Sequence, residues 1–356
     1  MASTSASSTP PLDDVACDAD SNRVLSIQSH VVRGYVGNKC ATFPLQLHGF
    51  EVDAINSVQF STHTFYPHCV GAGQVLTSDD LWTVYNGLRQ NDLVRKYTHL
   101  LTGYCRDETF LKKIADIIQD LKAQTTGNTK LCYVCDPVLG DRGNYYVPQE
   151  LMPIYRDKIT LLADVITPNQ FELQMLSGLE VTNERSVLAA LDVLHARGNR
   201  AIVVTSTELA PSSELMYVYG SVFENDHSKP VNFADGAGFA ECLKNIANAS
   251  ETQRFRYSIR RLDATFVGTG DLFTALLLVW LQKTNRDLAL SVGRVLRCMQ
   301  EVLERTLRAA QRELQGEGRA HEVPGPAELE LRLIQCSSLL LNPPNESAHV
   351  QGPVPL

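Results

Sequence analysis

The chain has 356 residues, a formal net charge of −8 and 44% hydrophobic residues. This length suffices for one large α/β domain or two smaller ones. No apolar run approaches the roughly 20 residues that a membrane-spanning helix needs, and the negative charge argues against nonspecific binding to nucleic acid or anionic membranes. A phosphate group would have to be held by a local pocket.

The N-terminal residues 1–21 are rich in Ser, Thr, Ala and Pro and lack the apolar core of a signal peptide. We predict a disordered leader in a cytoplasmic protein, in which cysteines stay reduced. Cys132 and Cys135 form a C-x-x-C pair. They fall on a predicted strand, where residues three apart point to opposite faces, so we expect two core thiols and no zinc or redox site.

Strand and helix patterns alternate through the first two thirds of the chain. Periodicity predicts strands at residues 23–29, 51–58, 98–103, 130–135, 163–167 and 201–206. It predicts helices ending at residue 47 and spanning residues 78–96, 107–122, 169–177 and 184–197. Strands joined by helix-length crossovers predict an α/β fold of three layers, with a mainly parallel central sheet and helices on both faces.

The pattern changes after residue 214, where antiparallel edge strands are predicted at 215–223 and 255–262. The residues 224–255 between them have no clear period and are interpreted as a loop insertion. An entirely apolar helix follows Asp271, and an amphipathic helix is predicted at 286–314. We predict one domain over residues 22–340, followed by a disordered tail at 341–356.

The turn Gly268-Thr269-Gly270-Asp271 directly precedes the apolar helix. Two glycines let the backbone turn sharply and expose successive N–H groups, and a helix N-terminus adds unpaired donors and a positive partial charge. This combination indicates a phosphate site. Asp271 is then either a helix cap or a general base that takes a proton from a hydroxyl group, and the motif alone does not decide between them.

Polar residues follow most of the predicted strands, at the sheet edge where ligands bind in such folds. Asp136 ends one strand, and Asp141 follows across a turn that contains Pro and Gly. Two carboxylates near a phosphate site suit Mg²⁺, which prefers carboxylates, phosphates and water. A solvated turn is the alternative interpretation of this pair. Metal, anion turn and base together would suit phosphoryl transfer.

The order of these motifs resembles the ribokinase-like superfamily of small-molecule kinases and, within it, the pyridoxal kinase family. The resemblance extends from about residue 23 to about residue 310. The matching blocks are residues 26–30, 33–38, 56–61, 63–64, 101–104, 134–141, 166–172 and 266–273. The resemblance implies ATP-dependent phosphorylation of the 5′-hydroxymethyl group of pyridoxal, pyridoxine or pyridoxamine in vitamin B6 salvage. It also implies Mg²⁺, a monovalent cation (K⁺ or Na⁺) and a homodimer.

The resemblance also implies a role for each matching residue. Asp271 would be the catalytic base, and Gly268, Thr269 and Gly270 would form the anion hole. The substrate would be held or enclosed by Ser29, Val36, Phe60, His63, Thr64, Tyr104, Gly270 and Asp271. The nucleotide would contact Asp136, Asn169, Glu172, Thr205, Ser206, Leu262, Asp263, Ala264 and Thr269. The cations would lie near Asp136, Asp141, Thr167, Glu172 and Thr205.

Three other expectations bear on these roles. At a helix N-terminus, Asp271 is expected to be ionised and only weakly basic, so its position should matter more than its basicity. Phe65 and Cys69 replace an expected Gly and Trp beside the pyridine pocket, which bears on the choice of vitamer. The loop 142–145 is shorter than in animal members of the family.

The alternatives are a hydroxymethylpyrimidine kinase of the same superfamily, a non-catalytic carrier of the vitamin and a nicotinamide-binding protein. The intact Gly268–Asp271 turn argues against a carrier. A nicotinamide site would need G-x-G-x-x-G after the first strand, and Gly34-Tyr35-Val36-Gly37 does not supply it. Four residues favour a pyridoxal kinase over a pyrimidine kinase: Ser29, Phe60, His63 and Thr64.

Overall fold

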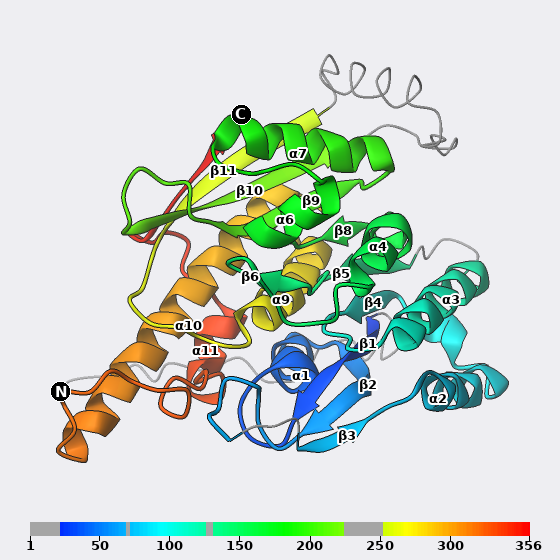
Figure 1. Ribbon diagram of the computed structural model, residues 1–356, viewed down its shortest axis with the longest axis horizontal. Helices are drawn as coiled ribbons and strands as arrows, with labels where there is room; N and C mark the ends of the chain where they lie inside the picture. Colours follow the sequence, from blue (N-terminus) through cyan, green and yellow to red (C-terminus); the bar gives the residue numbers. More distant parts are fainter. Residues whose placement is uncertain (1–21, 69–71, 126–130, 224–251) are drawn as a thin grey trace, which may run out of the picture.

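The computed structural model describes residues 22–68, 72–125, 131–223 and 252–356. Its centre is a ten-stranded sheet that crosses the molecule (Figure 1). The spatial order is β12 (Val350–Pro355), β11 (Thr252–Arg260), β10 (Leu215–Phe223), β9 (Ala201–Thr207), β8 (Val165–Ile166), β5 (Cys132–Cys135), β4 (His99–Thr102), β1 (Arg23–Val31), β2 (Glu51–Phe60) and β3 (Gly73–Val75).

The strands from β9 to β2 in this order are parallel, and those at both edges are antiparallel. Parallel strands need crossover connections, which the intervening helices supply. The prediction of a mainly parallel sheet with antiparallel edge strands is therefore confirmed.

Helices cover both faces of the sheet. One face carries α2 (Ser78–Gln90), α3 (Glu108–Gln124), α4 (Leu151–Ile154), α5 (Thr160–Leu162), α6 (Gln170–Ser177) and α7 (Glu184–Arg197). The other carries α1 (Gly37–Leu47), α9 (Thr269–Lys283), α10 (Leu288–Gly316) and α11 (Ser337–Leu341). Short elements are the 3₁₀ turns Val94–Lys96 and Ile334–Cys336, the π-helical turn Tyr155–Ile159 and the hairpin β6 (Gly140–Asp141) and β7 (Asn144–Tyr145).

The strand β5 shows how the sheet separates two cores. Tyr133 and Cys135 pack into the core under α3, α6 and α7, whereas Cys132 and Val134 pack into the core under α9 and α10. Both cysteines are buried reduced thiols. The expectation of two core thiols on opposite faces is confirmed.

Helix α9 is the apolar helix that the sequence predicts after Asp271. Residues Leu272 to Val279 are buried, and the helix packs against α1 and α10. Burying such a segment on all sides removes a large apolar area from water, at about 25 cal/mol per Å². Within the described part of the chain, no helix is long and apolar enough to cross a membrane.

The structure differs from the sequence predictions at several segments. Part of the predicted disordered tail forms β12, which pairs with the open edge of β11, Phe255 opposite Pro355. An edge position tolerates the prolines of this strand. The helix predicted at 78–96 ends at Gln90. The helical segment 151–162 was not predicted, because the π-helical turn within it interrupts the 3.6-residue period.

Two predicted disordered or irregular segments fall mainly outside the described residues. The predicted leader, residues 1–21, lies entirely there. Of the predicted insertion 224–255, residues 224–251 also lie outside the described part of the chain, and the remainder belongs to β11.

Candidate functional site

The candidate site lies where the parallel strands end and α9 begins. Ser29 occupies an irregularity in β1, where the pairing with β2 shifts register between Gln28 and His30. Asp136 directly follows β5, and Thr167 directly follows β8. A Cβ atom added to Gly270 would lie 3.1 Å from Oδ2 of Asp136, so the strand end and the glycine turn adjoin each other.

The glycine turn is fixed by close backbone packing. Gly268 precedes α9 with φ of +83°, and a Cβ atom there would lie 1.9 Å from the carbonyl oxygen of Tyr35. The thiol of Cys40 donates a hydrogen bond to the carbonyl oxygen of Gly268 at 3.4 Å. Thr269 and Gly270 are the first two residues of α9, where backbone N–H groups lack partners within the helix. The turn can therefore receive an anion.

Asp271 is the third residue of α9 rather than its cap. Its carboxylate accepts a hydrogen bond from the backbone N–H of Gly37, the first residue of α1. Burial nevertheless raises the pKa of Asp271 to about 6. The expectation of a weakly basic carboxylate is wrong, because loss of hydration outweighs the hydrogen bond from Gly37. Asp271 is ionised at neutral pH and is a better base than an exposed aspartate.

Asp136 and Glu172 are two buried carboxyl groups, and Asp136 lies near both Glu172 and the half-buried Asp271. Burial, followed by the charges of Glu172 and Asp271, raises the pKa of Asp136 well above its usual range. Burial also raises the pKa of Glu172 to about 7, although its oxygens accept backbone N–H groups from Asn169 and Leu139, each at 2.9 Å, and from Gly140 at 3.5 Å. Neighbouring buried carboxyl groups repel each other when ionised. A bound cation would relieve this repulsion.

The other predicted cation neighbours surround this pair. Asp141 lies on β6, and burial raises its pKa. Thr167 is buried, with its hydroxyl 3.2 Å from that of Thr274. Among the described residues, no group of three or more His, Cys, Asp and Glu side chains is arranged to hold a metal by itself. The donor set nevertheless fits Mg²⁺, which commonly takes one or two carboxylates and completes its shell with phosphates and water.

The predicted nucleotide residues lie on three neighbouring segments. Asn169 caps α6 and also donates from Nδ2 to the carbonyl oxygen of Gly140 at 2.7 Å. Thr205 and Ser206 are near the end of β9, and the N–H of Thr205 donates to the carbonyl oxygen of Pro168 at 3.0 Å. The residues between β11 and α9 supply the third segment, in which Leu262 and Ala264 are half-buried and Asp263 is exposed.

Several predicted substrate residues meet in a small apolar cluster. Val36 and Phe60 are buried together with Val31 and Val58, and Tyr104 packs against them. The side chain of Val267, next to the glycine turn, completes this cluster. An apolar wall beside an anion turn and a carboxylate suits a ring that carries a hydroxyl group.

The remaining predicted substrate residues lie on the turn after β2. His63 is buried, whereas Thr64 is exposed. Phe65, 46% exposed, meets the equally exposed Tyr146 edge to face, with ring centroids 6.1 Å apart. Cys69 lies outside the described residues.

Comparison with known proteins identifies the family. The chain is 45% identical to the human pyridoxal kinase over 328 residues, which cover 90% of this chain and 96% of that protein. It is 41% identical to the pyridoxal kinase of Arabidopsis thaliana, over 94% of this chain and 96% of that one. The chain belongs to the pyridoxal kinase family.

Comparison of structures agrees. The pyridoxal kinase from Leishmania donovani in complex with ADP and pyridoxine superposes with a TM-score of 0.77 at 30% identity, over 95% of this chain and all of that one. A family model described as phosphomethylpyrimidine kinase matches residues 110–243. The fold is therefore that of the ribokinase-like kinases, as the sequence predicted.

One residue near the substrate segments was not predicted from the sequence. Glu330, between α10 and α11, accepts a hydrogen bond from the N–H of Tyr35 at 3.1 Å and lies 3.3 Å from Nε2 of His63. A usable signal was present, because buried Leu329, Leu331 and Leu333 alternate with polar residues. Such alternation indicates a segment with one face in the core.

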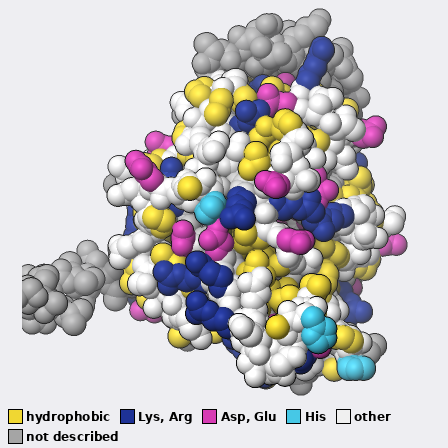
Figure 2. All heavy atoms as spheres, turned by 90° about the vertical axis from the view of Figure 1, so that its left-hand side faces the viewer, with side chains coloured by type: hydrophobic (Ala, Val, Ile, Leu, Met, Phe, Trp, Pro, Cys, Tyr) yellow, Lys and Arg dark blue, Asp and Glu magenta, His cyan; other side chains and the backbone are white. Residues whose placement is uncertain are grey.

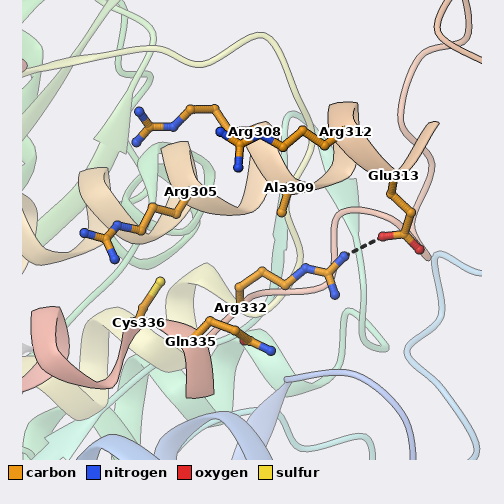
Figure 3. Close-up of a pocket in the computed structure, with 8 residues that line it drawn as sticks. All are labelled: Arg305, Arg308, Ala309, Arg312, Glu313, Arg332, Gln335 and Cys336. Atoms are coloured by element: carbon orange, nitrogen blue, oxygen red, sulfur yellow. Dashed lines mark hydrogen bonds and ion pairs between the residues drawn. The ribbon is translucent and has the colours of Figure 1, made fainter. Parts of the chain in front are cut away.

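A groove of about 660 Å³ lies elsewhere, between α10 and the segment that follows it (Figure 3). Its lining includes Arg305, Arg308, Arg312 and Arg332, and Arg332 pairs with Glu313 at 2.8 Å. Basic and acidic side chains are interspersed over the face of the molecule in Figure 2. None of the predicted site residues lines this groove.

We expect Gly268→Ala to lower the kinase turnover number by about a hundredfold, because a 1 Å displacement of catalytic groups costs about that much. The added methyl group would collide with the carbonyl oxygen of Tyr35. Gly316→Ala, where a Cβ meets nothing within 4 Å, is the control and should behave as the parent chain. Steady-state kinetics measure both. Turnover of Gly268→Ala within twofold of the parent would contradict the assignment.

Proposed function

We propose that this chain transfers the γ-phosphoryl group of ATP to the 5′-hydroxymethyl group of pyridoxal, and also of pyridoxine and pyridoxamine, in vitamin B6 salvage. The observation that carries the proposal is the half-buried Asp271, with its raised pKa, beside the glycine turn. Related kinases from Leishmania donovani have been crystallised with ADP and pyridoxine and with ADP and pyridoxamine. The apolar cluster around Phe60 supplies the wall for the pyridine ring.

The chemistry follows from these positions. A primary alcohol is a poor nucleophile, so a carboxylate at hydrogen-bond distance both orients it and accepts its proton. The substrate oxygen forms a bond to the γ-phosphorus while the bond from that phosphorus to the β–γ bridging oxygen breaks, and ADP leaves. N–H groups of Gly268, Thr269 and Gly270 would stabilise the charge on the phosphoryl oxygens. Asp271, with a pKa of about 6, is ionised at neutral pH and able to take the proton.

The buried carboxyl groups give the nucleotide site its cation requirement. Asp136 and Glu172, with Asp141, Thr167 and Thr205 nearby, would hold Mg²⁺ and a monovalent cation (K⁺ or Na⁺). Burial, together with the charges of Glu172 and Asp271, raises the pKa of Asp136 and supports this assignment. Bound cations would neutralise charge on the ATP phosphates. We assign Asn169, Ser206, Leu262, Asp263 and Ala264 to the rest of the nucleotide site.

The proposal extends to the setting of the enzyme. We assign residues 22–340 to one kinase domain, to which β12 adds an edge strand. The family resemblance supports a homodimer. The six described cysteines are buried and reduced, which is typical of proteins from reducing compartments and supports a cytoplasmic location.

The second candidate function is phosphorylation of a hydroxymethylpyrimidine. The family model that matches residues 110–243 is described as phosphomethylpyrimidine kinase, which points to a pyrimidine substrate. Pyridoxal and hydroxymethylpyrimidine both present a hydroxymethyl group on an aromatic ring. The two functions differ in the acceptor, so a direct comparison of acceptors separates them.

We expect the purified protein, with Mg²⁺, K⁺ and ATP, to form ADP rapidly with pyridoxal, pyridoxine or pyridoxamine and only slowly with hydroxymethylpyrimidine. The apolar cluster and His63 are the reason. A coupled assay of ADP formation measures kcat/KM for each acceptor. A higher kcat/KM with the pyrimidine would favour the second function, and binding of pyridoxal without turnover would indicate a carrier.

We expect Asp136→Asn to raise the Mg²⁺ concentration for half-maximal activity about tenfold or more, because it removes a carboxylate from the cation site. Affinity for pyridoxal should change little. Asp116→Asn, which removes an exposed carboxylate paired with Lys113, controls for the loss of charge. An unchanged Mg²⁺ requirement in Asp136→Asn would contradict the assignment.

A further inference from the structure

Glu330 connects two loops that carry predicted substrate residues. Its Oε2 accepts a hydrogen bond from the N–H of Tyr35 at 3.1 Å, on the loop that leads to Val36. Its Oε1 accepts from the hydroxyl of Tyr66 at 3.0 Å and lies 3.3 Å from Nε2 of His63, both on the turn after β2. One carboxylate from the C-terminal part of the chain therefore holds both loops.

The protein backbone leaves room for this carboxylate. Gly34 adopts φ of +98°, and a Cβ atom there would lie 2.3 Å from Oε1 of Glu330. The two loops already share a backbone hydrogen bond from the N–H of Arg33 to the carbonyl oxygen of Ser61, at 3.0 Å. In addition to that bond, Glu330 contacts the backbone N–H of Tyr35 on one loop and the side chains of His63 and Tyr66 on the other.

The segment that carries Glu330 is itself held firmly. Leu329 and Leu331 are buried in the protein core. Arg332 donates its backbone N–H to the hydroxyl of Thr306 on α10 at 3.2 Å, and its guanidinium pairs with Glu313 at 2.8 Å. The side chain of Glu330 is therefore presented from a fixed base.

The surroundings of Glu330 determine which atoms carry protons. Burial alone would raise the pKa of Glu330, but hydrogen bonds from His63, Tyr66 and the N–H of Tyr35 lower it overall. An ionised carboxylate accepts only, so Nε2 of His63 must donate. Nδ1 of His63 is buried and has no hydrogen-bond partner among the described residues. A buried polar atom without a partner is costly, and a bound ligand would satisfy it.

We propose that Glu330 is a positioning residue of the pyridine site. It holds the loop of Tyr35 against the turn of His63, and it fixes His63 with a proton on Nε2. Nδ1 then accepts a hydrogen bond from a donor group of the bound pyridine. The inference rests on the proposed phosphorylation of pyridoxal and assigns part of its substrate selectivity to a residue outside the motifs of the family resemblance.

The test compares Glu330→Gln with Glu328→Gln. Glu328 belongs to the same segment, and its side chain is 14% exposed against 12% for Glu330. It bonds to the N–H of Gly325 and to Arg319, away from the substrate loops. Steady-state kinetics would give KM for pyridoxal, KM for ATP and kcat, and thermal melting would report folding.

We expect Glu330→Gln to raise KM for pyridoxal about tenfold or more, the usual effect of losing a hydrogen bond to a charged group. KM for ATP should stay within twofold, and Glu328→Gln should match the parent chain. An equal rise in both KM values, or no rise in KM for pyridoxal, would overturn the proposal. A purely structural role would move both constants or only the melting temperature.

A double-mutant cycle with His63→Asn tests the link to the histidine. If Glu330 acts through His63, Glu330→Gln should raise KM for pyridoxal much less in the His63→Asn background. Additive effects would overturn the role of His63. If Glu330→Gln fails to fold, His63→Asn tests the same link, because it removes Nε2 and with it the contact to Glu330. It should then raise KM for pyridoxal and leave KM for ATP within twofold, and an unchanged KM for pyridoxal would overturn the proposal.

The parent chain separates this inference from the proposed function. If it phosphorylates pyridoxal while Glu330→Gln has the same KM, the inference fails and the function stands. If the parent chain does not turn over pyridoxal, the proposed function fails. The same variants are then compared by equilibrium binding of pyridoxal. A loss of affinity of about tenfold in Glu330→Gln alone would still support the role of Glu330. An unchanged affinity in Glu330→Gln would overturn that role.

Discussion

The desolvation of Asp271, which is half-buried between two helix N-termini, is the constraint on which the site depends. Helix α9 has apolar side chains all around, so it is stable only when enclosed by the sheet, α1 and α10. Enclosure brings the N–H of Gly37 to the carboxylate and the carbonyl oxygen of Tyr35 against Gly268. The same packing that stabilises the core therefore raises the pKa of the proposed base and closes the anion turn around it.

The loops around Asp271 form one connected unit. Tyr35 contacts Gly268 through its carbonyl group and Glu330 through its N–H. Glu330 in turn reaches His63 and Tyr66. The loop of Tyr35 therefore contacts the anion turn through the backbone. The carboxylate of Glu330, which is distant in sequence, connects the same loop with the turn of His63. Tyr35 is therefore one of the residues that connect the proposed pyridine site with the proposed anion turn, together with Gly37, whose N–H bonds to Asp271.

The sequence predicted the fold well where local patterns determine it. Alternating strands and helices predicted the parallel sheet, and Asp136 and Thr167 directly follow β5 and β8, at the edge where the sequence places them. Sequence patterns did not predict the features that depend on packing between segments distant in the chain. The pKa of Asp271 depends on its desolvation in the folded chain, strand β12 depends on the free edge of β11, and the hydrogen bonds of Glu330 link residues 264 and 295 positions apart. No local period reports such contacts.

The most direct test of this account is the pH dependence of turnover in the parent chain and in Asp271→Asn. Because the base acts ionised and its pKa is raised to about 6, kcat of the parent chain should fall as the pH drops through about 6. Asp271→Asn should bind pyridoxal nearly normally, turn over at least about a hundredfold more slowly, and show no such fall. A fall that persists in Asp271→Asn, or turnover close to that of the parent chain, would contradict the account.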